Sequence, residues 1–219
     1  LEFLMPFPRQ AGILLHPTSL PGRYGMGEIG PEAHRWLANL NSMSQKLWQV
    51  LPLGPTGYGD SPYQTLSTFA GNTMLISFDS LQDEGLLREE DLKDFPLFPE
   101  GHVDYGPVLI ARSRILDKVA KSFARRASPA LKAGWMQFCE KESHWLNDYT
   151  LFCALKKEYG GGPWVQWPED LRQRQTSAIL EAKKKHSVEM KYSTILQFLF
   201  FHQWNSLRRE AKKRGISII

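Results

Sequence analysis

The sequence has little of several features that mark whole classes of protein. It contains only 2 cysteines in 219 residues, too few for a cysteine-based metal cluster, so we expect Cys139 and Cys153 to be reduced thiols and no metal site to be present. No Gly-Lys-Ser or Gly-Lys-Thr sequence occurs, which excludes a P-loop for nucleotide phosphates. No apolar run approaches the roughly 18 residues of a membrane span. The start, LEFLMPFP, has neither the basic residues nor the long apolar core of a signal peptide.

These absences favour a globular protein of the cytoplasm, or of the plastid stroma if a transit peptide has been lost, with no membrane partner. The net charge is small, since 27 basic and 23 acidic residues give a formal charge of +4 at pH 7. Charged residues of both signs are dispersed along the chain. The densest basic stretches, Lys183–Lys185 and Arg208–Arg214, are typical of solvated helix faces, and no base-stacking or groove-reading motif accompanies them. We therefore expect no nucleic acid partner.

The chain does have a hydrophobic content of 42%, enough for the core of one large or two small domains, and a change of character over residues 46–72. Residues 46–53 form a nearly continuous apolar run, typical of a parallel strand covered on both faces. Glycines and prolines then end the strand. Ligand-binding residues of α/β enzymes lie at such strand ends, although an ordinary strand-to-helix connection has a similar composition. The polar loop presents Tyr58, Asp60, Ser61, Tyr63, Gln64, Ser67 and Asn72.

A first strand is predicted over residues 11–16, AGILLH, with His16 at its carboxyl end. A glycine-rich loop leads from it to an amphipathic helix that begins at Pro31. Strand, loop, helix and strand make one right-handed βαβ unit, as in parallel barrels and doubly wound sheets. The glycines lack the compact strand-to-helix turn of a dinucleotide fingerprint, so we expect no nucleotide cofactor.

Most of the remaining chain is predicted to be helical. Residues 80–92 are expected to form a helix capped by Ser80 or Asp79, and apolar residues recur at helical spacing through residues 103–185. A further helix is predicted over residues 195–214. A glycine ends it, and the apolar ISII that follows begins a third strand.

Long stretches of the sequence match one pattern. They are RQAGILLHPTSLPGRYGMGEIGPEA at residues 9–33, WQVLPLGPTGYGDSPYQ at residues 48–64, HWLNDYTLFCALKKEYGG at residues 144–161 and LQFLFFHQWNSLRREAKKRGISII at residues 196–219, with the shorter VDY and WVQWP between them. These motifs resemble the 4-α-glucanotransferases, also called amylomaltases or disproportionating enzymes. The resemblance covers essentially the whole chain from Arg9 onward, with a small departure at Thr73, where a proline is expected.

The resemblance implies an α/β fold, an incomplete (β/α)8 TIM barrel of which this chain supplies about three of the eight strands, with a large, mainly helical insertion. Residues 1–80 would be the start of the catalytic barrel, residues 81–194 the insertion, and residues 195–219 a helix and strand that return to the barrel. A bare apolar strand at the end of a chain leaves an unpaired edge. We therefore expect the sequence to be the amino-terminal part of a longer protein.

By this resemblance, the parent protein transfers a segment of an α-1,4-glucan to the 4-hydroxyl of an acceptor glucan or glucose. The reaction would be a retaining double displacement through a covalent intermediate, with no metal or organic cofactor. Its substrates would be maltooligosaccharides and starch- or glycogen-type α-1,4-glucans, with glucose as an acceptor. Two alternatives remain open: an α-amylase-like hydrolase, in which water replaces the acceptor, and a non-catalytic glucan-binding or vestigial domain.

The resemblance also assigns roles to individual residues. Tyr63 would stack on the glucose next to the scissile bond, with a hydroxyl contact from Ser61. Asp60 and His16 complete the expected substrate-binding set, although the His16 ring could instead be satisfied within the barrel wall. The residues expected in a second glucan-binding groove are Tyr58 and Tyr105.

No catalytic residue is expected within this chain. Retaining glycoside chemistry needs two carboxyl groups roughly 5 Å apart, and Asp60 has no acidic partner near it in the sequence. In the family, the nucleophile and the acid/base lie on later strands, so we expect both of them beyond Ile219. The chain alone should then be inactive, and it should fold poorly because its few strands lack neighbours. Trp164 and Trp167 could also bind sugar, but a place in a helical core is the preferred interpretation.

Overall fold

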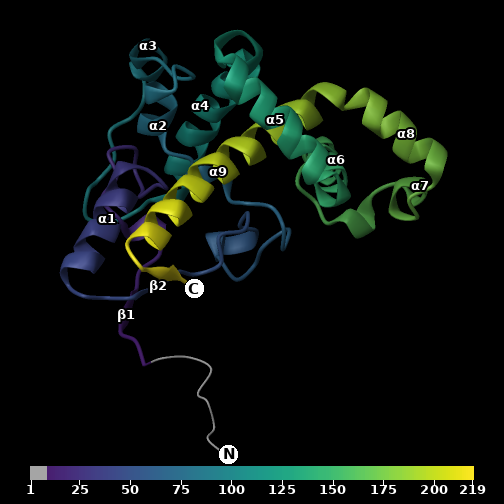
Figure 1. The fold of residues 1–219 in the computed structure, drawn as a ribbon. Helices are drawn as coiled ribbons and strands as arrows, with labels where there is room; N and C mark the ends of the chain where they lie inside the picture. The colour runs from purple at the N-terminus through teal and green to yellow at the C-terminus, as the bar shows by residue number, and fades with distance from the viewer. Residues whose placement is uncertain (1–8) are drawn as a thin grey trace, which may run out of the picture.

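The computed structural model describes residues 9–219, in which helices dominate and a small parallel sheet lies at one end (Figure 1). The sheet contains β1 (Gly12–Leu14), β2 (Leu47–Gln49) and β3 (Ser217–Ile218) in the order β1-β2-β3. Both pairs are parallel, with Trp48 of β2 opposite Ile13 of β1 and Ile218 of β3. The three predicted strands and the α/β class are confirmed, although each strand is shorter than its apolar run.

The sheet is covered on one face only by the residues that the structure describes. Trp48 is fully buried and shares the main core with Leu37 and Leu207, whereas Leu14 is 55% exposed. Side chains of a strand alternate between its two faces. Trp48 therefore points to one face of the sheet, and Leu47 and Gln49 point to the other. The prediction that residues 46–53 form a strand covered on both faces is therefore wrong for this chain: the strand has three residues, and Gln49 is exposed.

The helix between the first two strands forms as its sequence predicts. Helix α1 (Pro31–Ser42) has Pro31 in its first turn, where a proline costs no hydrogen bond, and follows Gly30 as N-cap. Its buried residues are Ala33, Leu37 and Leu40, spaced three and four apart on one face. This spacing places α1 against the core beside Trp48.

Short helices lie before α1 and after β2. They are the 3-10 turns η1 (Pro17–Ser19), η2 (Tyr58–Asp60) and η3 (Thr73–Leu75) and the helices α2 (Phe78–Asp83) and α3 (Glu89–Leu92), η1 alone lying before α1. The prediction of one helix over residues 80–92 is wrong, because Gly85 adopts a left-handed φ of +71° and separates α2 from α3. The predicted cap is also wrong: the Ser77 hydroxyl accepts the Ser80 N–H at 3.3 Å.

The predicted helical block is confirmed. It comprises α4 (Tyr105–Arg126), α5 (Pro129–Lys141), α6 (Ser143–Glu158), η4 (Trp164–Gln166), α7 (Glu169–Arg172) and α8 (Thr176–Lys185). Figure 1 shows α7 and α8 at the end of the molecule farthest from the strands. Trp167 is buried there with Leu151 and Leu155, as predicted, but Trp164 is 53% exposed, so the core interpretation is wrong for it.

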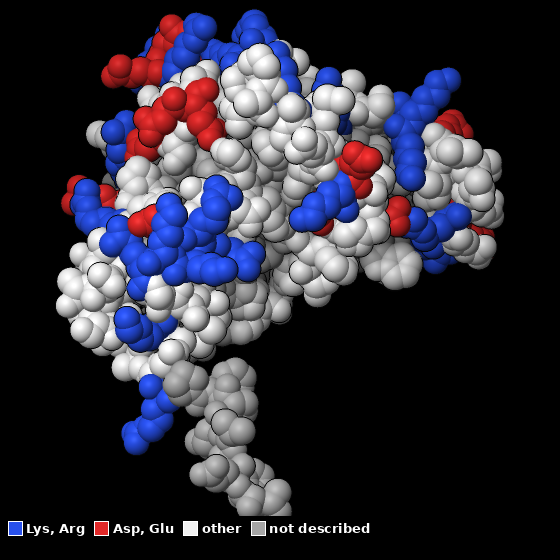
Figure 2. Space-filling model, viewed as in Figure 1, with Lys and Arg blue, Asp and Glu red and all other residues white. Residues whose placement is uncertain are grey.

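Helix α9 (Ser187–Lys213) begins eight residues before the predicted 195 and runs back to the sheet, where Gly215 ends it with a φ of +65°. Figure 2 shows Lys and Arg gathered over its last turns, where Arg208, Arg209 and Lys212 are exposed, as the solvated-face prediction requires. Within residues 9–219, no helix has the length and apolar character needed to cross a membrane. Cys139 and Cys153 are free thiols.

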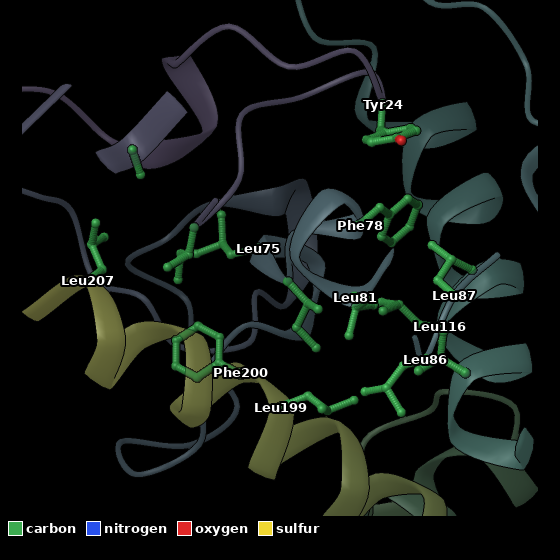
Figure 3. Close-up of a cluster of buried hydrophobic side chains, with 14 of the residues drawn as sticks. Tyr24, Leu75, Phe78, Leu81, Leu86, Leu87, Leu116, Leu199, Phe200 and Leu207 are labelled. Carbon is green, nitrogen blue, oxygen red and sulfur yellow. The ribbon is translucent and has the colours of Figure 1, made fainter. Parts of the chain in front are cut away.

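One main core joins the sheet end to the long helices. Figure 3 shows its centre, where Leu75 and Phe78 meet Leu116 of α4 and Leu199 and Phe200 of α9. Residues from all three predicted segments of the chain thus pack into a single cluster, to which Leu75, Ile76 and Phe78 belong and against which Met74 packs.

Candidate functional site

A cavity of about 190 Å³ lies beyond the carboxyl ends of β1 and β2. We call it the strand-end cavity. It brings together three of the predicted site residues, His16, Asp60 and Tyr105, although they are far apart in the sequence. The remaining lining residues are Thr18, Ser19, Met26, Leu51, Pro52, Thr56, Pro62, Asn72, Met74 and Leu109.

His16 follows β1 directly and is the N-cap of η1. Within residues 9–219 its Nδ1 atom is buried and has no hydrogen-bond partner. Burial lowers the pKa of the imidazole below its ordinary value, so the ring is held neutral. A neutral imidazole in a polar cavity can donate one hydrogen bond and accept another, which suits a hydroxyl-bearing ligand.

Asp60 is presented by a folded-back loop. The loop is closed by a bridge between Thr56 and Thr65, with the Gly57 N–H donating to the Gln64 carbonyl at 2.7 Å. Asp60 itself has a φ of +55°, a left-handed conformation that Asp tolerates better than most residues. Gly59, directly before it, also has a left-handed φ of +70°, and the folded-back loop places Asp60 at the wall of the cavity.

Tyr105 is the first residue of α4 and lies across the cavity from this loop. Its hydroxyl donates to Oγ1 of Thr18 at 3.4 Å, which ties the start of α4 to the turn after β1. The structure thus places Tyr105 in the same cavity as His16 and Asp60, not on a separate surface.

The two other tyrosines lie differently. The ring of Tyr63 is 71% exposed and does not line the cavity, while its backbone N–H donates to Oγ of Ser61 at 3.4 Å. Pro62, between them, does line it. An exposed ring beside a polar cavity is free to stack on a ligand. The backbone of Tyr58 forms η2, but its side chain lies outside the described part of the structure.

The cavity has one carboxyl group. Of the residues that line it, only Asp60 is acidic, so the arrangement can bind a polar ligand but does not supply the two carboxyl groups of retaining glycoside chemistry. Within residues 9–219 no cluster of three or more His, Cys, Asp or Glu side chains could hold a metal ion. The cavity therefore combines hydroxyls, one imidazole, one carboxylate and the Asn72 amide with apolar walls.

Ile219, the residue beyond which the catalytic carboxyl groups are expected, continues the pairing of β3 with β2. Its N–H donates to the Trp48 carbonyl at 3.0 Å, and its carbonyl accepts the Val50 N–H at 2.9 Å. Its side chain is 60% exposed, has no titratable group and does not line the strand-end cavity. Ile219 is therefore no site residue itself, and the location of the nucleophile and the acid/base beyond it stays a prediction.

A wall of the cavity comes from residues 71–77. Asn72 and Met74 line it, and the Asn72 N–H donates to the Leu53 carbonyl at 2.7 Å. Asn72 also caps η3, since its Oδ1 accepts the Met74 N–H at 3.0 Å. The loop position of Asn72 singles it out in the sequence, whereas nothing in the sequence marks Met74 as a site residue.

A buried ion pair stands behind this wall. The Arg112 guanidinium, which has no exposed surface, donates to Oε1 of Glu28 at 2.6 Å and to the carbonyls of Met74 at 3.0 Å and Ile76 at 2.7 Å. Burial raises the pKa of the Glu28 carboxyl, and the neighbouring Arg112 charge opposes that rise. Arg112 lies in a stretch of helical spacing, and only its partners reveal its role.

A parallel sheet flanked by helices, with a small polar cavity at its strand ends, places the chain in the α/β class, in which ligand sites lie at this edge of the sheet. Residues 15–219 match the family model described as 4-alpha-glucanotransferase, and the chain belongs to that family. The resemblance seen in the motifs is thereby confirmed.

Relatives agree with this assignment. The chain is 47% identical over 215 residues to the 4-alpha-glucanotransferase of Thermus thermophilus, covering 98% of this chain and 42% of that protein. It is 38% identical to the chloroplastic/amyloplastic enzyme of Solanum tuberosum, covering 96% of this chain and 37% of the relative. Among solved structures, the amylomaltase of Streptococcus agalactiae in complex with acarbose superposes with a TM-score of 0.87 at 34% identity, covering 96% of this chain and 42% of that chain. The chain thus spans about two fifths of the length of these relatives.

Proposed function

We propose that this chain supplies the glucan-binding part of a 4-α-glucanotransferase, which transfers a segment of an α-1,4-glucan to the 4-hydroxyl of an acceptor glucan or glucose. The observation that carries the proposal is the strand-end cavity, which gathers His16, Asp60 and Tyr105 beside the exposed ring of Tyr63. Support comes from the family match over residues 15–219 and from the acarbose complex of the similar amylomaltase.

We also propose that β1, β2 and β3 are neighbouring strands of a (β/α)8 barrel. Their parallel order and the helices on one face fit a barrel wall, in which the other face would point to the barrel interior. The exposed side chain of Leu14 lies on that second face. The strand ends that bear the cavity would then belong to the barrel mouth, where such enzymes bind their substrates.

In this proposal each polar group has a task. The Tyr63 ring stacks on a glucose face, where the sugar C–H groups meet its π cloud, and Ser61 contacts a hydroxyl. His16 and Asp60 hydrogen-bond further hydroxyls, one as a neutral imidazole and the other as an acceptor. Tyr105 contacts the sugar inside the strand-end cavity, and Tyr58 extends the contact to longer glucans. The ligands are maltooligosaccharides and starch- or glycogen-type glucans, handled in the cytoplasm or the plastid.

The chemistry of the transfer is a double displacement. One carboxylate attacks the anomeric carbon while a second carboxyl group protonates the leaving oxygen, and the same group later deprotonates the acceptor hydroxyl. The strand-end cavity holds only Asp60, so this chain binds and orients the glucan but does not complete the pair. Incubation of the chain alone with maltotriose should accordingly release no glucose.

The proposal is tested by replacing the matching region of the Thermus thermophilus relative with this chain and assaying glucose release from maltotriose. We expect the chimera to be active, Tyr63→Ala to lower kcat/KM by about tenfold or more, and Tyr63→Phe to change it by less than about threefold, because the ring makes the contact. A chimera that folds but binds glucans without transfer would favour a non-catalytic domain. Equal losses in the two Tyr63 variants would rule out stacking.

A further inference from the structure

Two buried glutamines of α9 hold the backbone of residues 71–77. The Gly71 N–H donates to Oε1 of Gln197 at 2.9 Å, and Nε2 of Gln197 donates to the Gly71 carbonyl at 2.9 Å. Likewise, the Ser77 N–H donates to Oε1 of Gln203 at 2.7 Å, and Nε2 of Gln203 donates to the Ser77 carbonyl at 3.2 Å. Gln197 is 1% exposed and Gln203 5%. Each side-chain amide thus pairs with both the N–H and the C=O of one residue, as a residue of a neighbouring antiparallel strand would.

The two pairs have the same separation of 126 residues along the chain. Between the two pairs, the 71–77 segment and α9 therefore contain the same number of residues and must span about the same distance. A helix rises about 1.5 Å per residue and an extended strand about 3.3 Å, so a fully extended segment would outrun the helix between the two glutamines. The 3-10 turn η3 lies inside the segment and shortens it. Both pairs can form because of this turn.

Other contacts also hold the 71–77 segment against α9 and α4. A Cβ atom added to Gly71 would lie 2.0 Å from the ring of Phe200, so only glycine allows this approach to α9. From the opposite side, Arg112 of α4 takes the carbonyls of Met74 and Ile76. Backbone groups in a core need such partners, because no water reaches them.

The held segment forms a wall of the strand-end cavity. Asn72, directly after Gly71, and Met74 line the cavity together with His16 and Asp60. Neither glutamine lines it. Any effect of Gln197 or Gln203 on a bound ligand must therefore pass through the backbone that they hold.

We propose that Gln197 and Gln203 are positioning residues of the glucan site, which fix the 71–77 segment so that Asn72 and Met74 keep the shape of the cavity. This inference rests on the proposed function, since it takes the cavity as the glucan site. Gln197 has the larger role because its partner Gly71 is the neighbour of Asn72, whereas Ser77 lies beyond η3.

The test uses the chimera of this chain with the Thermus thermophilus relative and maltoheptaose as the probe, with binding and chemical shifts followed by NMR well below Tm. Gln197→Met and Gln203→Met keep side-chain length and remove both hydrogen bonds. Leu207→Ala, at a fully buried position of α9, is the control that destabilises the same helix without removing a hydrogen bond to the segment. We expect Kd to rise about tenfold in Gln197→Met and about threefold in Gln203→Met, and to stay within about twofold in Leu207→Ala, although Tm falls in all three.

The proposal would be overturned if the rise in Kd were proportional to the fall in Tm, with the same proportion in all three variants. If Gln197→Met does not fold, the comparison of Gln203→Met with Leu207→Ala decides the question. If the chimera with the unmodified chain folds but does not bind maltoheptaose, the proposed function fails separately. Positioning is then judged from the NMR signals of the Asn72 amide and the His16 ring. Shifts confined to the glutamine variants would support it, and their absence would refute it.

Discussion

Tyr105 and Tyr58 are both expected to contact long glucans, yet Tyr105 is anchored inside the strand-end cavity. Its ring is fixed at the start of α4, and its hydroxyl reaches Thr18 at 3.4 Å. A sugar ring that enters the cavity beside His16 and Asp60 would meet Tyr105 whatever the length of the glucan. The consequences of replacing the two tyrosines should therefore differ.

We predict that Tyr105→Ala, in the chimera with the Thermus thermophilus relative, lowers kcat/KM for maltotriose by about tenfold, as expected for the loss of one stacking or packing ring. Tyr105→Phe should retain most of the activity because it loses only the long bond to Thr18. Tyr58→Ala should weaken binding of amylose and leave maltotriose kinetics unchanged. Steady-state assays with both substrates check this, and maltotriose kinetics that collapse in Tyr58→Ala would place that residue in the cavity as well.

At the scale of the secondary-structure elements, Arg112 contacts more separate segments of the chain than any other buried charged residue described above. From α4 it reaches the carbonyl of Tyr24 in the glycine-rich loop, the Glu28 carboxylate, and the backbone around η3. Its guanidinium also lies over the ring of Phe78 in α2, 4.3 Å from the ring centroid. Removing it would leave the Glu28 carboxylate without its guanidinium partner, although the Phe78 N–H still donates to Oε2 at 3.3 Å, and it would take one donor from each of three carbonyls.

We predict that Arg112→Met lowers the free energy of unfolding by about 3–5 kcal/mol, the range for breaking a buried pair on one side. A second change, Glu28→Gln in the same chain, should recover part of that loss because it removes the uncompensated charge. Urea unfolding followed by tryptophan fluorescence measures both. A single variant that costs less than about 1 kcal/mol would mean that water reaches Glu28.

The elements that could be predicted from sequence are those with local causes. Pro31 and the spacing of Ala33, Leu37 and Leu40 define α1 without reference to the rest of the chain. The start of α2 depends instead on which serine turns its hydroxyl toward the helix, and Ser77 is selected because Gln203 holds its backbone. Tertiary contacts thus decide which residue caps α2, and the local sequence does not contain them. The cap predicted from the sequence, Ser80 or Asp79, was therefore wrong.

The same distinction applies to the site. His16 and Asp60 follow apolar runs and were predictable as strand-end residues. The glutamines of α9 are hidden inside the run ILQFLFFHQW, where polar residues interrupt a buried face for no local reason. A glutamine in such a run indicates a buried partner, but only the folded chain identifies it as Gly71 or Ser77.

At the scale of the whole molecule, two histidines make stability depend on pH. Burial lowers the pKa of His16 and, as the largest effect, that of His34 in α1 below the ordinary value of 6.5. In the unfolded chain both rings bind protons more readily than in the folded one, so their contribution to stability is complete above that value. It is lost as the pH falls from about 6.5 toward the folded pKa.

We predict that the free energy of unfolding falls more steeply between pH 7.5 and pH 5.5 in the unmodified chain than in the double variant His16→Gln with His34→Gln, where these pH values bracket the ordinary histidine pKa of about 6.5. Comparing slopes is necessary because the raised pKa of Glu28 acts in the opposite direction. Urea titrations at several pH values give both slopes. Parallel slopes would show that the two rings are as accessible to protons in the folded chain as in the unfolded one.

The constant offset of 126 residues between the 71–77 segment and its glutamines also bears on biosynthesis. A ribosome that adds roughly 5–20 residues per second needs about 6–25 seconds to travel from Gly71 to Gln197. During that time the cavity residues on the nascent chain have been synthesised, but the 71–77 segment lacks the support of α9. The long-range contact must wait for the last helix, so the cavity is among the final parts of this chain to take shape.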